Sequence, residues 1–170
     1  MRCAVIESPI GPLTLVGNGV GIRELRYGRD VRAHPEAPVE DDPLLGAVAA
    51  QLRRYFAGDL EEFDVPVSWG DVTPFQKAVY EAMSRTTYGE MVSYGDLARE
   101  VGSPRASRAV GQACNRNPLP ILVPCHRVVA SDGSLGGYGA GLEAKRHLLA
   151  LERGGDVPGG GWEPAHNAVR

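Results

Sequence analysis

The sequence is poor in cysteine and contains no long apolar run. Cys3, Cys114 and Cys125 are its only cysteines, and no Cys-X-X-Cys pair occurs. This argues against a disulfide-stabilised secreted domain and against a zinc finger. No stretch approaches the about 20 consecutive apolar residues of a membrane span, and the first residues lack the apolar segment of a secretory signal. We therefore expect a cytoplasmic protein that does not act at a membrane.

Lysine is also scarce, since the basic side chains are 16 Arg and 2 Lys, and the net charge is −3. A negative total argues against a nucleic-acid partner, but the charge is unevenly distributed. Residues 1–74 sum to −5, residues 75–153 to +3 and residues 154–170 to −1. The second half is thus suited to an anionic partner. A balance of +3 is equally common in proteins that never bind DNA, so charge alone leaves both interpretations open.

The first third of the chain predicts a small sheet followed by a helix. Three short apolar or alternating runs predict strands, at residues 4–6, 13–16 and 22–25. Gly17-Asn18-Gly19 suits a tight hairpin between the last two. Asp42-Pro43 is a typical helix start, and Gly58 is a typical end. Residues 63–67 predict one more strand, at an edge because Pro66 has no N–H to donate.

From Thr73 onward the apolar spacing is helical. Thr73-Pro74-Phe75-Gln76 is a capping box that starts a helix to about Arg85. Its expected buried residues are Phe75, Val79, Tyr80 and Met83. A second helix is expected to start at Ser93 and to end at Gly102, and a third is expected from Arg105 to about Cys114. Two short helices joined by a tight turn make a helix-turn-helix candidate.

A last amphipathic helix is expected over residues 142–152. Its expected apolar members are Leu142, Leu148, Leu149 and Leu151. Residues 154–170 are rich in Gly and Pro and are expected to be a disordered tail.

Cys125 and His126 are the pair with the clearest chemical potential. The thiolate is the nucleophilic form of cysteine, and a free thiol with a pKa of about 8.5 needs a base such as histidine. Adjacent side chains of a strand point to opposite faces. The two residues must therefore sit on a turn or communicate through a water. A working base is usually held by a third group, and Glu152 is a candidate. Taken alone, Cys125 also fits a small buried hydrophobe.

Residues 117–129 resemble the signature of a known family. Their sequence, Asn-Pro-Leu-Pro-Ile-Leu-Val-Pro-Cys-His-Arg-Val-Val, is similar to that of the methylated-DNA–protein-cysteine methyltransferases, or O6-alkylguanine-DNA alkyltransferases. Further segments match in order and spacing, at residues 8–11, 73–76, 88–90, 93–94, 107–111, 137–138 and 148–152. The resemblance covers about residues 1–153, and its Pro-Cys-His-Arg-Val core is highly specific.

The resemblance implies an α+β fold of two domains. Residues 1–70 would form an N-terminal antiparallel sheet with a helix, of the ribonuclease H-like kind. Residues 71–153 would form a helical domain with a winged helix-turn-helix that binds DNA and accepts the alkyl group. The implied partner is double-stranded DNA that contains O6-alkylguanine. We expect a monomer that needs no cofactor.

The resemblance also implies a mechanism of direct DNA repair. Members of the family flip an O6-alkylated guanine out of the duplex and move its alkyl group irreversibly to a cysteine, so each molecule acts once. O4-alkylthymine is a further candidate substrate. By the match, Cys125 is the acceptor, His126 removes its proton through a bridging water, and Glu152 orients His126. Asn117 would brace the active-site turn, and Tyr94 would donate to the flipped base. Without the family, Tyr94 fits a half-buried helix aromatic.

The resemblance assigns further residues to DNA and to the substrate pocket. Arg108 matches the finger that fills the space left by the flipped base, although by itself it fits an exposed helix arginine. The other DNA-binding candidates are Tyr94, Ser93, Ser103, Arg105, Ala109 and Arg116. The candidates for the pocket wall are Cys114, Val128, Tyr138 and Gly139.

The sequence departs from the family pattern at two pocket positions. Gly139 stands where many relatives have a serine, so only its backbone N–H can bond the alkylated oxygen, and larger alkyl groups gain room. Cys114 stands where human-type members have a larger apolar residue, and a helix-core role is favoured over a catalytic one. Some members bind zinc in the first domain, but Cys3 has no second cysteine within the first 113 residues. No metal site is therefore expected.

Three other functions use the same features differently. A non-catalytic relative that binds alkylated DNA and signals to excision repair lacks the acceptor cysteine, which is present here. A cysteine hydrolase would need an oxyanion hole, which the sequence does not display, and would leave the helix-turn-helix unexplained. A plain helix-turn-helix regulator would leave Cys125 and His126 unexplained.

Overall fold

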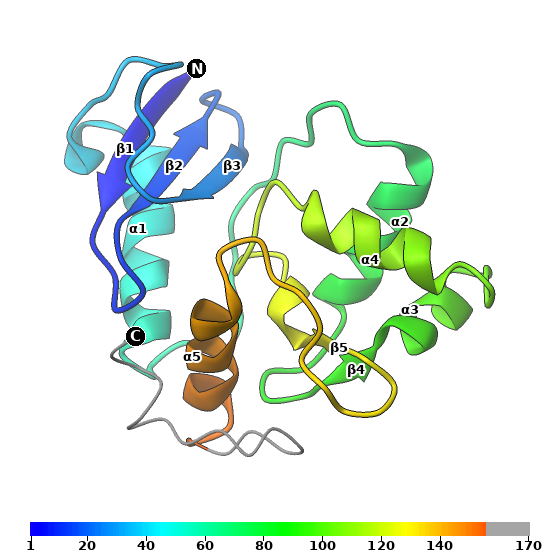
Figure 1. Cartoon of the computed structure of the whole chain (residues 1–170). Helices are drawn as coiled ribbons and strands as arrows, with labels where there is room; N and C mark the ends of the chain where they lie inside the picture. Colours follow the sequence, from blue (N-terminus) through cyan, green and yellow to red (C-terminus); the bar gives the residue numbers. More distant parts are fainter. Residues whose placement is uncertain (156–170) are drawn as a thin grey trace. The chain divides into compact units, whose positions relative to one another are not determined.

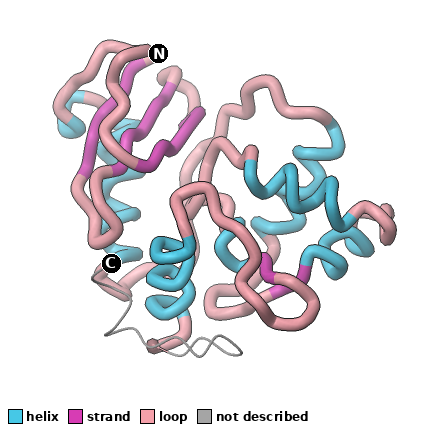
Figure 2. Tube along the Cα trace, in the orientation of Figure 1, coloured by secondary structure: helices cyan, strands magenta, loops and turns pink. Residues whose placement is uncertain are grey.

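The computed structural model describes residues 1–155, which divide into two compact units between Asp71 and Val72 (Figures 1 and 2). The sequence predicts this boundary one residue earlier, after residue 70. The part of the tail from residue 156 onward lies outside the described residues. Within residues 1–155, no helix is both long and apolar enough to cross a bilayer.

The first unit is a three-stranded antiparallel sheet backed by a helix (Figure 1). Its strands are β1 (Arg2–Ile6), β2 (Leu13–Gly17) and β3 (Ile22–Tyr27), in the order β1-β2-β3. The central strand β2 is buried along its whole length, and helix α1 (Pro43–Phe56) packs against all three strands. The three predicted strands are confirmed.

Local signals set the limits of α1. The Asp42 carboxylate accepts the N–H of Leu45 at 3.0 Å, and Pro43 occupies the first turn. The short 3₁₀ helix η1 (Val39–Asp41) precedes this cap. Gly58 follows the helix with a φ of +80°, a conformation that glycine adopts at little cost.

The strand predicted at residues 63–67 is not formed. Val67 makes a single bridge beside Ile22. The Pro66 carbonyl accepts the N–H of Ile22 at 2.8 Å, and Ser68 donates to the carbonyl of Ile22 at 2.9 Å. Because Pro66 itself cannot donate, pairing along this segment stops after one bridge.

The second unit begins with three helices that pack on one another. They are α2 (Pro74–Ser84), α3 (Tyr94–Glu100) and α4 (Ser107–Asn115). Thr73 and Ser93 each cap a helix through a capping box. The turn between α3 and α4 contains Gly102 with a φ of +79°. This arrangement is the predicted helix-turn-helix.

The rest of the second unit surrounds the cysteine. Strands β4 (Val92–Ser93) and β5 (Val128–Val129) pair in parallel. The 3₁₀ turn η2 (Cys125–Arg127) runs directly into β5, and helix α5 (Leu142–Glu152) packs against η2 (Figure 1). The segment between β5 and α5 is the glycine-rich loop, residues 130–141. The fold is thus the α+β arrangement predicted from the sequence.

Three details of the helix predictions are wrong. Helix α4 begins at Ser107 and not at Arg105, because Ala106 closes a turn onto the carbonyl of Ser103 at 2.8 Å. Phe75 is only half-buried. Leu142 is 39% exposed, and Leu151 is half-buried. The face that α5 buries instead includes two charged residues, Lys145 and Glu152.

Candidate functional site

Cys125 lies on the turn η2, which is one of the two arrangements that the sequence leaves open. Its N–H donates to the carbonyl of Val123 at 2.8 Å, and the N–H of Arg127 donates to the carbonyl of Pro124 at 3.1 Å. The residue is 5% exposed. Burial raises the pKa of the Cys125 thiol, while hydrogen bonding from Asn117 and Tyr138 and the charge of Lys145 act to lower it. The resting side chain is therefore a thiol that needs a base to become a nucleophile.

His126 and Glu152 form a buried dyad beside this thiol. The His126 Nε2 lies 2.7 Å from the Glu152 Oε2, and both side chains are fully buried. Burial lowers the pKa of His126, so the imidazole is neutral at pH 7. The other ring nitrogen, Nδ1, is buried and has no hydrogen-bond partner among the described residues. The predicted third group is thus in place across 26 residues of chain.

Arg127 binds the same carboxylate through two nitrogens and is not among the residues predicted for the site. Its Nε lies 2.8 Å from Glu152 Oε1 and its Nη2 lies 3.2 Å from Oε2. Its Nη1 donates to the Thr86 carbonyl at 2.9 Å. Burial opposes ionisation of Glu152, but hydrogen bonds from His126 and Arg127, together with their charges, hold its pKa well below the ordinary range.

Asn117 braces the segment that leads to Cys125. Its Nδ2 donates to the Val123 carbonyl at 2.8 Å, and its Oδ1 accepts the N–H of Leu119 at 3.0 Å. Between these anchors Ile121 has a φ of +73°, which is costly for a β-branched residue. The two hydrogen bonds of Asn117 close this turn around the strained residue.

The glycine-rich loop closes against the Tyr94 ring. A β-carbon added at Gly136, whose φ is +69°, would lie 2.8 Å from the Tyr94 hydroxyl. On another side of the ring, Gly111 of α4 leaves ordinary contact distance, 3.9 Å for an added β-carbon. Burial raises the pKa of Tyr94, and the neighbouring Cys114 and Cys125 raise it further. The phenol therefore stays protonated and can donate.

Lys145 ties the same loop to the end of the cysteine turn. Its buried ammonium donates to the carbonyl of Val128 at 2.6 Å, to that of Gly137 at 3.4 Å and also to that of Leu135. Burial lowers its pKa to about 8. These hydrogen bonds of Lys145, together with the close contact of Gly136 with Tyr94, place the loop beside Tyr94 and Cys125.

The predicted pocket residues lie at different depths. Cys114 is partly buried on α4, where its sulfur lies 3.7 Å from the sulfur of Met83, and burial raises its pKa to about 12. Val128 is fully buried. Tyr138 is half-buried and Gly139 is exposed in the glycine-rich loop. Cys114 thus has the environment of a core thiol, as the sequence favours.

The predicted DNA-binding residues are mostly exposed on the helix-turn-helix. Arg105, Arg108, Ala109 and Arg116 are exposed, and Ser103 is half-buried. Ser93 differs, because its hydroxyl oxygen already accepts the N–H of Asp96 at 2.9 Å as the cap of α3.

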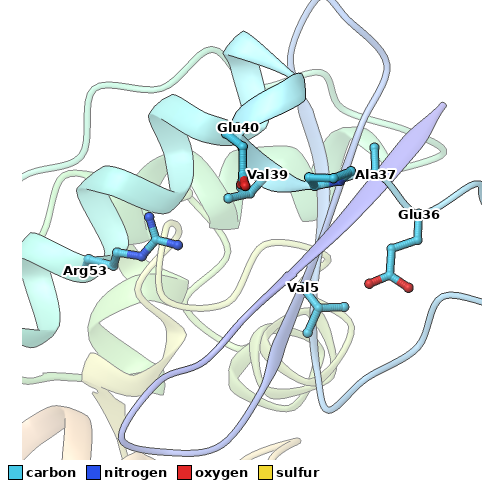
Figure 3. A pocket seen from close by; sticks show the side chains of 7 residues that line it. Val5, Glu36, Ala37, Val39, Glu40 and Arg53 are labelled. Carbon is cyan, nitrogen blue, oxygen red and sulfur yellow. The ribbon is translucent and has the colours of Figure 1, made fainter.

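A hollow of about 490 Å³ lies in the first unit (Figure 3). Its lining residues are Val5, Glu36, Ala37, Pro38, Val39, Glu40 and Arg53. Glu36 is already paired with Arg29 at 2.8 Å. Nowhere in residues 1–155 do three His, Cys, Asp or Glu side chains gather as metal ligands would.

Sequence reasoning missed Arg127 and Lys145, although each left a signal. Arg127 directly follows His126 in the Pro-Cys-His-Arg tetrad. Lys145 lies three residues before Leu148 and four before Leu149, so helical spacing places it on the buried face. A lysine on an apolar face indicates a buried and fully bonded ammonium.

Both units match domains of one family. Residues 1–69 match the description "6-O-methylguanine DNA methyltransferase, ribonuclease-like domain". Residues 74–154 match "6-O-methylguanine DNA methyltransferase, DNA binding domain". Together these matches account for nearly all of the described chain.

Individual relatives and solved structures agree with this match. A methylated-DNA–protein-cysteine methyltransferase of Methanosarcina acetivorans is 44% identical over 89% of this chain and 98% of its own length. One of Mycobacterium tuberculosis is 47% identical over 87% and 90%. The crystal structure of M. tuberculosis OGT in complex with DNA has a TM-score of 0.83 and 42% identity, covering 91% of this chain and 94% of that one. With both domains matched and relatives of this identity over most of its length, the chain belongs to the 6-O-methylguanine DNA methyltransferase family.

Proposed function

We propose that this protein repairs DNA by moving the alkyl group of O6-alkylguanine onto Cys125, once per molecule. The observation that carries the proposal is the buried His126–Glu152 dyad, whose histidine directly follows Cys125 in the sequence. The Nδ1 atom of His126 has no hydrogen-bond partner among the described residues. A neutral imidazole with one free nitrogen is a proton acceptor. The raised pKa of Cys125 makes such an acceptor necessary.

The transfer is a displacement at carbon in which each proton and electron pair is accounted for. The thiol S–H bond breaks as its proton passes, through a bridging water, to His126 Nδ1. The thiolate then forms an S–C bond to the alkyl carbon while the C–O6 bond breaks. The electron pair of that bond stays with the guanine, which takes up one proton from the solvent, and His126 returns the thiol proton to the solvent. The products are S-alkylcysteine and an unmodified guanine.

Tyr94 and the glycine-rich loop are suited to bind the leaving group, which is the guanine. A phenol whose pKa is raised by burial is a hydrogen-bond donor at neutral pH. Donation to the guanine ring stabilises the negative charge that develops there as the C–O6 bond breaks. Tyr138 and Gly139 would contribute to the wall that faces the alkylated oxygen, with Gly139 offering only its N–H.

The helix-turn-helix is proposed to bind double-stranded DNA. Four of the candidates, Arg105, Arg108, Ala109 and Arg116, are exposed and offer no negative charge. Arginine side chains neutralise phosphates, and a side chain inserted into the duplex offsets part of the cost of unstacking the flipped base. Arg108, near the start of α4, is assigned this second role.

The proposed function is tested by weighing the peptides of the reacted protein. After incubation with duplex DNA that contains O6-methylguanine, trypsin cleavage after Arg116 and Arg127 isolates Cys125 in the peptide 117–127. Cys114 is released separately in the peptide 109–116. We expect one added methyl group on peptide 117–127 and no more than one equivalent of repaired guanine.

The matched control removes the two other thiols. A Cys3→Ala/Cys114→Ala double variant should take up the same single methyl group, since neither thiol belongs to the proposed mechanism. Repeated turnover, a methyl group on another peptide, or tight binding with unmodified Cys125 would each contradict the proposal.

Replacing Arg108 by alanine should separate base flipping from the chemistry. We expect Arg108→Ala to slow repair of duplex DNA by about 10-fold or more, because unstacking a base costs a few kcal/mol. The reaction with free O6-benzylguanine, which needs no flipping, should keep its rate. Single-turnover rates with both substrates measure this, and Arg99→Ala on α3 serves as the control. Equal slowing with both substrates would rule out the finger role.

A further inference from the structure

The Glu152 carboxylate has a full set of hydrogen-bond donors. Its Oε1 accepts from Arg127 Nε at 2.8 Å and from the N–H of Gly89 at 3.2 Å. Its Oε2 faces His126 Nε2 at 2.7 Å and Arg127 Nη2 at 3.2 Å. A carboxylate has about four lone-pair sites, so this one is saturated. An ionised carboxylate only accepts, and His126 Nε2 must therefore carry the proton between them.

This geometry fixes the tautomer of His126. With the proton on Nε2, the neutral ring has its lone pair on Nδ1. That atom is the buried nitrogen without a partner among residues 1–155. The ring is thus ready to accept a proton only while Glu152 is ionised and His126 is neutral.

Arg127 supplies the charge that meets both conditions. Its side chain is 8% exposed and that of Glu152 is fully buried, so their interaction is weakly screened by water. A buried Glu152 with His126 as its sole partner would draw a second proton onto the dyad, since burial favours a neutral pair. The guanidinium balances the carboxylate without adding a proton to the imidazole.

We propose that Arg127 is a positioning residue that keeps Glu152 ionised and His126 neutral, so that His126 Nδ1 is free to take the thiol proton. The inference rests on the proposed function and deepens it, because it names the group that sets the working pH range of the dyad. Arg127 does not touch the reacting atoms and acts through Glu152.

The turn at residues 86–90 completes this arrangement. Arg127 Nη1 donates to the carbonyl of Thr86 at 2.9 Å and to its hydroxyl at 3.2 Å. Gly89 has a φ of +82°, and a β-carbon there would lie 3.2 Å from the Glu152 carbonyl oxygen. The glycine therefore lets the turn approach closely enough to donate to the carboxylate. This explains why a glycine suits position 89.

The other charged groups around His126 are few. Glu152 and Lys145 face it from α5, and Arg127 faces it from η2. The negative Glu152 favours the imidazolium, whereas Arg127 and Lys145 oppose it. Lys145 is held by three carbonyls and not by the carboxylate. Removing Arg127 therefore removes a cation that binds Glu152 directly through two hydrogen bonds.

The test is the pH dependence of the single-turnover transfer rate. For Arg127→Met we expect the acid limb of the profile to move up by about one pH unit or more, the usual effect of removing a close charge. Arg127→Lys keeps the charge but loses the two-point contact with Glu152. Its transfer rate should therefore fall, while its acid limb should move by less than half of the shift seen in Arg127→Met. A limb that stays in place in Arg127→Met would overturn the proposal.

The matched control is Arg153→Met. Arg153 directly follows α5, and its Nη1 donates to the carbonyl of Gly89 at 2.6 Å. Its acid limb should stay where it is in the wild type. An equal shift in Arg153→Met would overturn the proposal, since any nearby cation would then suffice.

Nuclear magnetic resonance of the wild-type chain tests the same proposal without a variant. The ¹⁵N shifts of His126 should show a neutral ring with its proton on Nε2 at pH 7. An imidazolium, or a proton on Nδ1, at that pH would overturn the proposal even if every variant fails to fold. Absence of methyl transfer at every pH would instead count against the proposed function, and the ring shifts of wild type and Arg127→Met compared at one pH would still test the role of Arg127.

Discussion

The Glu152→Gln variant is expected to lose about 3–5 kcal/mol of its free energy of unfolding. Its transfer rate should fall by about 10²-fold or more. The amide keeps the shape of the carboxylate but offers one acceptor oxygen in place of two. Arg127 then has a buried charge without a counter-charge, and His126 loses the group that orients it. The loss of stability comes from the guanidinium and the loss of rate from the imidazole.

The Glu152 carboxylate should also make the free energy of unfolding of the wild type fall at low pH. The pKa of Glu152 in the folded chain lies below its unfolded value of about 4.3. Its contribution is therefore complete above about pH 5 and is lost as the pH falls through and below the unfolded value. Urea unfolding of wild type and Glu152→Gln at several pH values should give curves that converge toward low pH.

The exposed Glu81 on α2 provides the control. Glu81→Gln removes one carboxylate of the same type and should change stability by less than about 0.5 kcal/mol. A Glu152→Gln variant as stable as Glu81→Gln, with an unchanged acid dependence, would show that the buried ion pair with Arg127 contributes nothing.

Features that depend on local sequence could be predicted. The capping residues Thr73 and Asp42 act within a few residues of themselves, and the β-strands follow from alternating runs. For the same reason the helix-turn-helix and the turn at Cys125 were predictable. The sequence predicts the start of α4 two residues too early, because Pro104 belongs to a turn that resembles a helix start in sequence.

Contacts between distant segments could be predicted only in part. The need for a third group makes Glu152 one candidate partner of His126, and only the family resemblance assigns it that role. Arg127 shares this carboxylate, and the N–H of Gly89 donates to it across 63 residues of chain. Both contacts depend on how α5 and the turn at residues 86–90 pack. Neither local propensity nor periodicity carries that information.

The buried Lys145 is the clearest case of such a contact, and its replacement has the second large expected effect. Lys145→Met should lower the free energy of unfolding by about 3 kcal/mol, because buried carbonyls that lose a donor cost about 1–3 kcal/mol each. Methionine fills a similar volume, so the loss reports the missing hydrogen bonds and not a cavity. The carbonyls of Leu135 and Gly137 would no longer be held to that of Val128.

The loss of these hydrogen bonds should also slow alkyl transfer, because the glycine-rich loop places Gly136 against the Tyr94 hydroxyl. A loop displaced by about 1 Å slows a positioned reaction by about 10-fold or more, so Lys145→Met should transfer slowly even where it is fully folded. Chemical unfolding and single-turnover rates at low temperature measure the two effects separately. The chain's other lysine, Lys77 on the exposed face of α2, provides the control, and Lys77→Met should match the wild type in both. If Lys145→Met also had the stability and the transfer rate of the wild type, the backbone of the loop and not the buried ammonium would determine the loop's position.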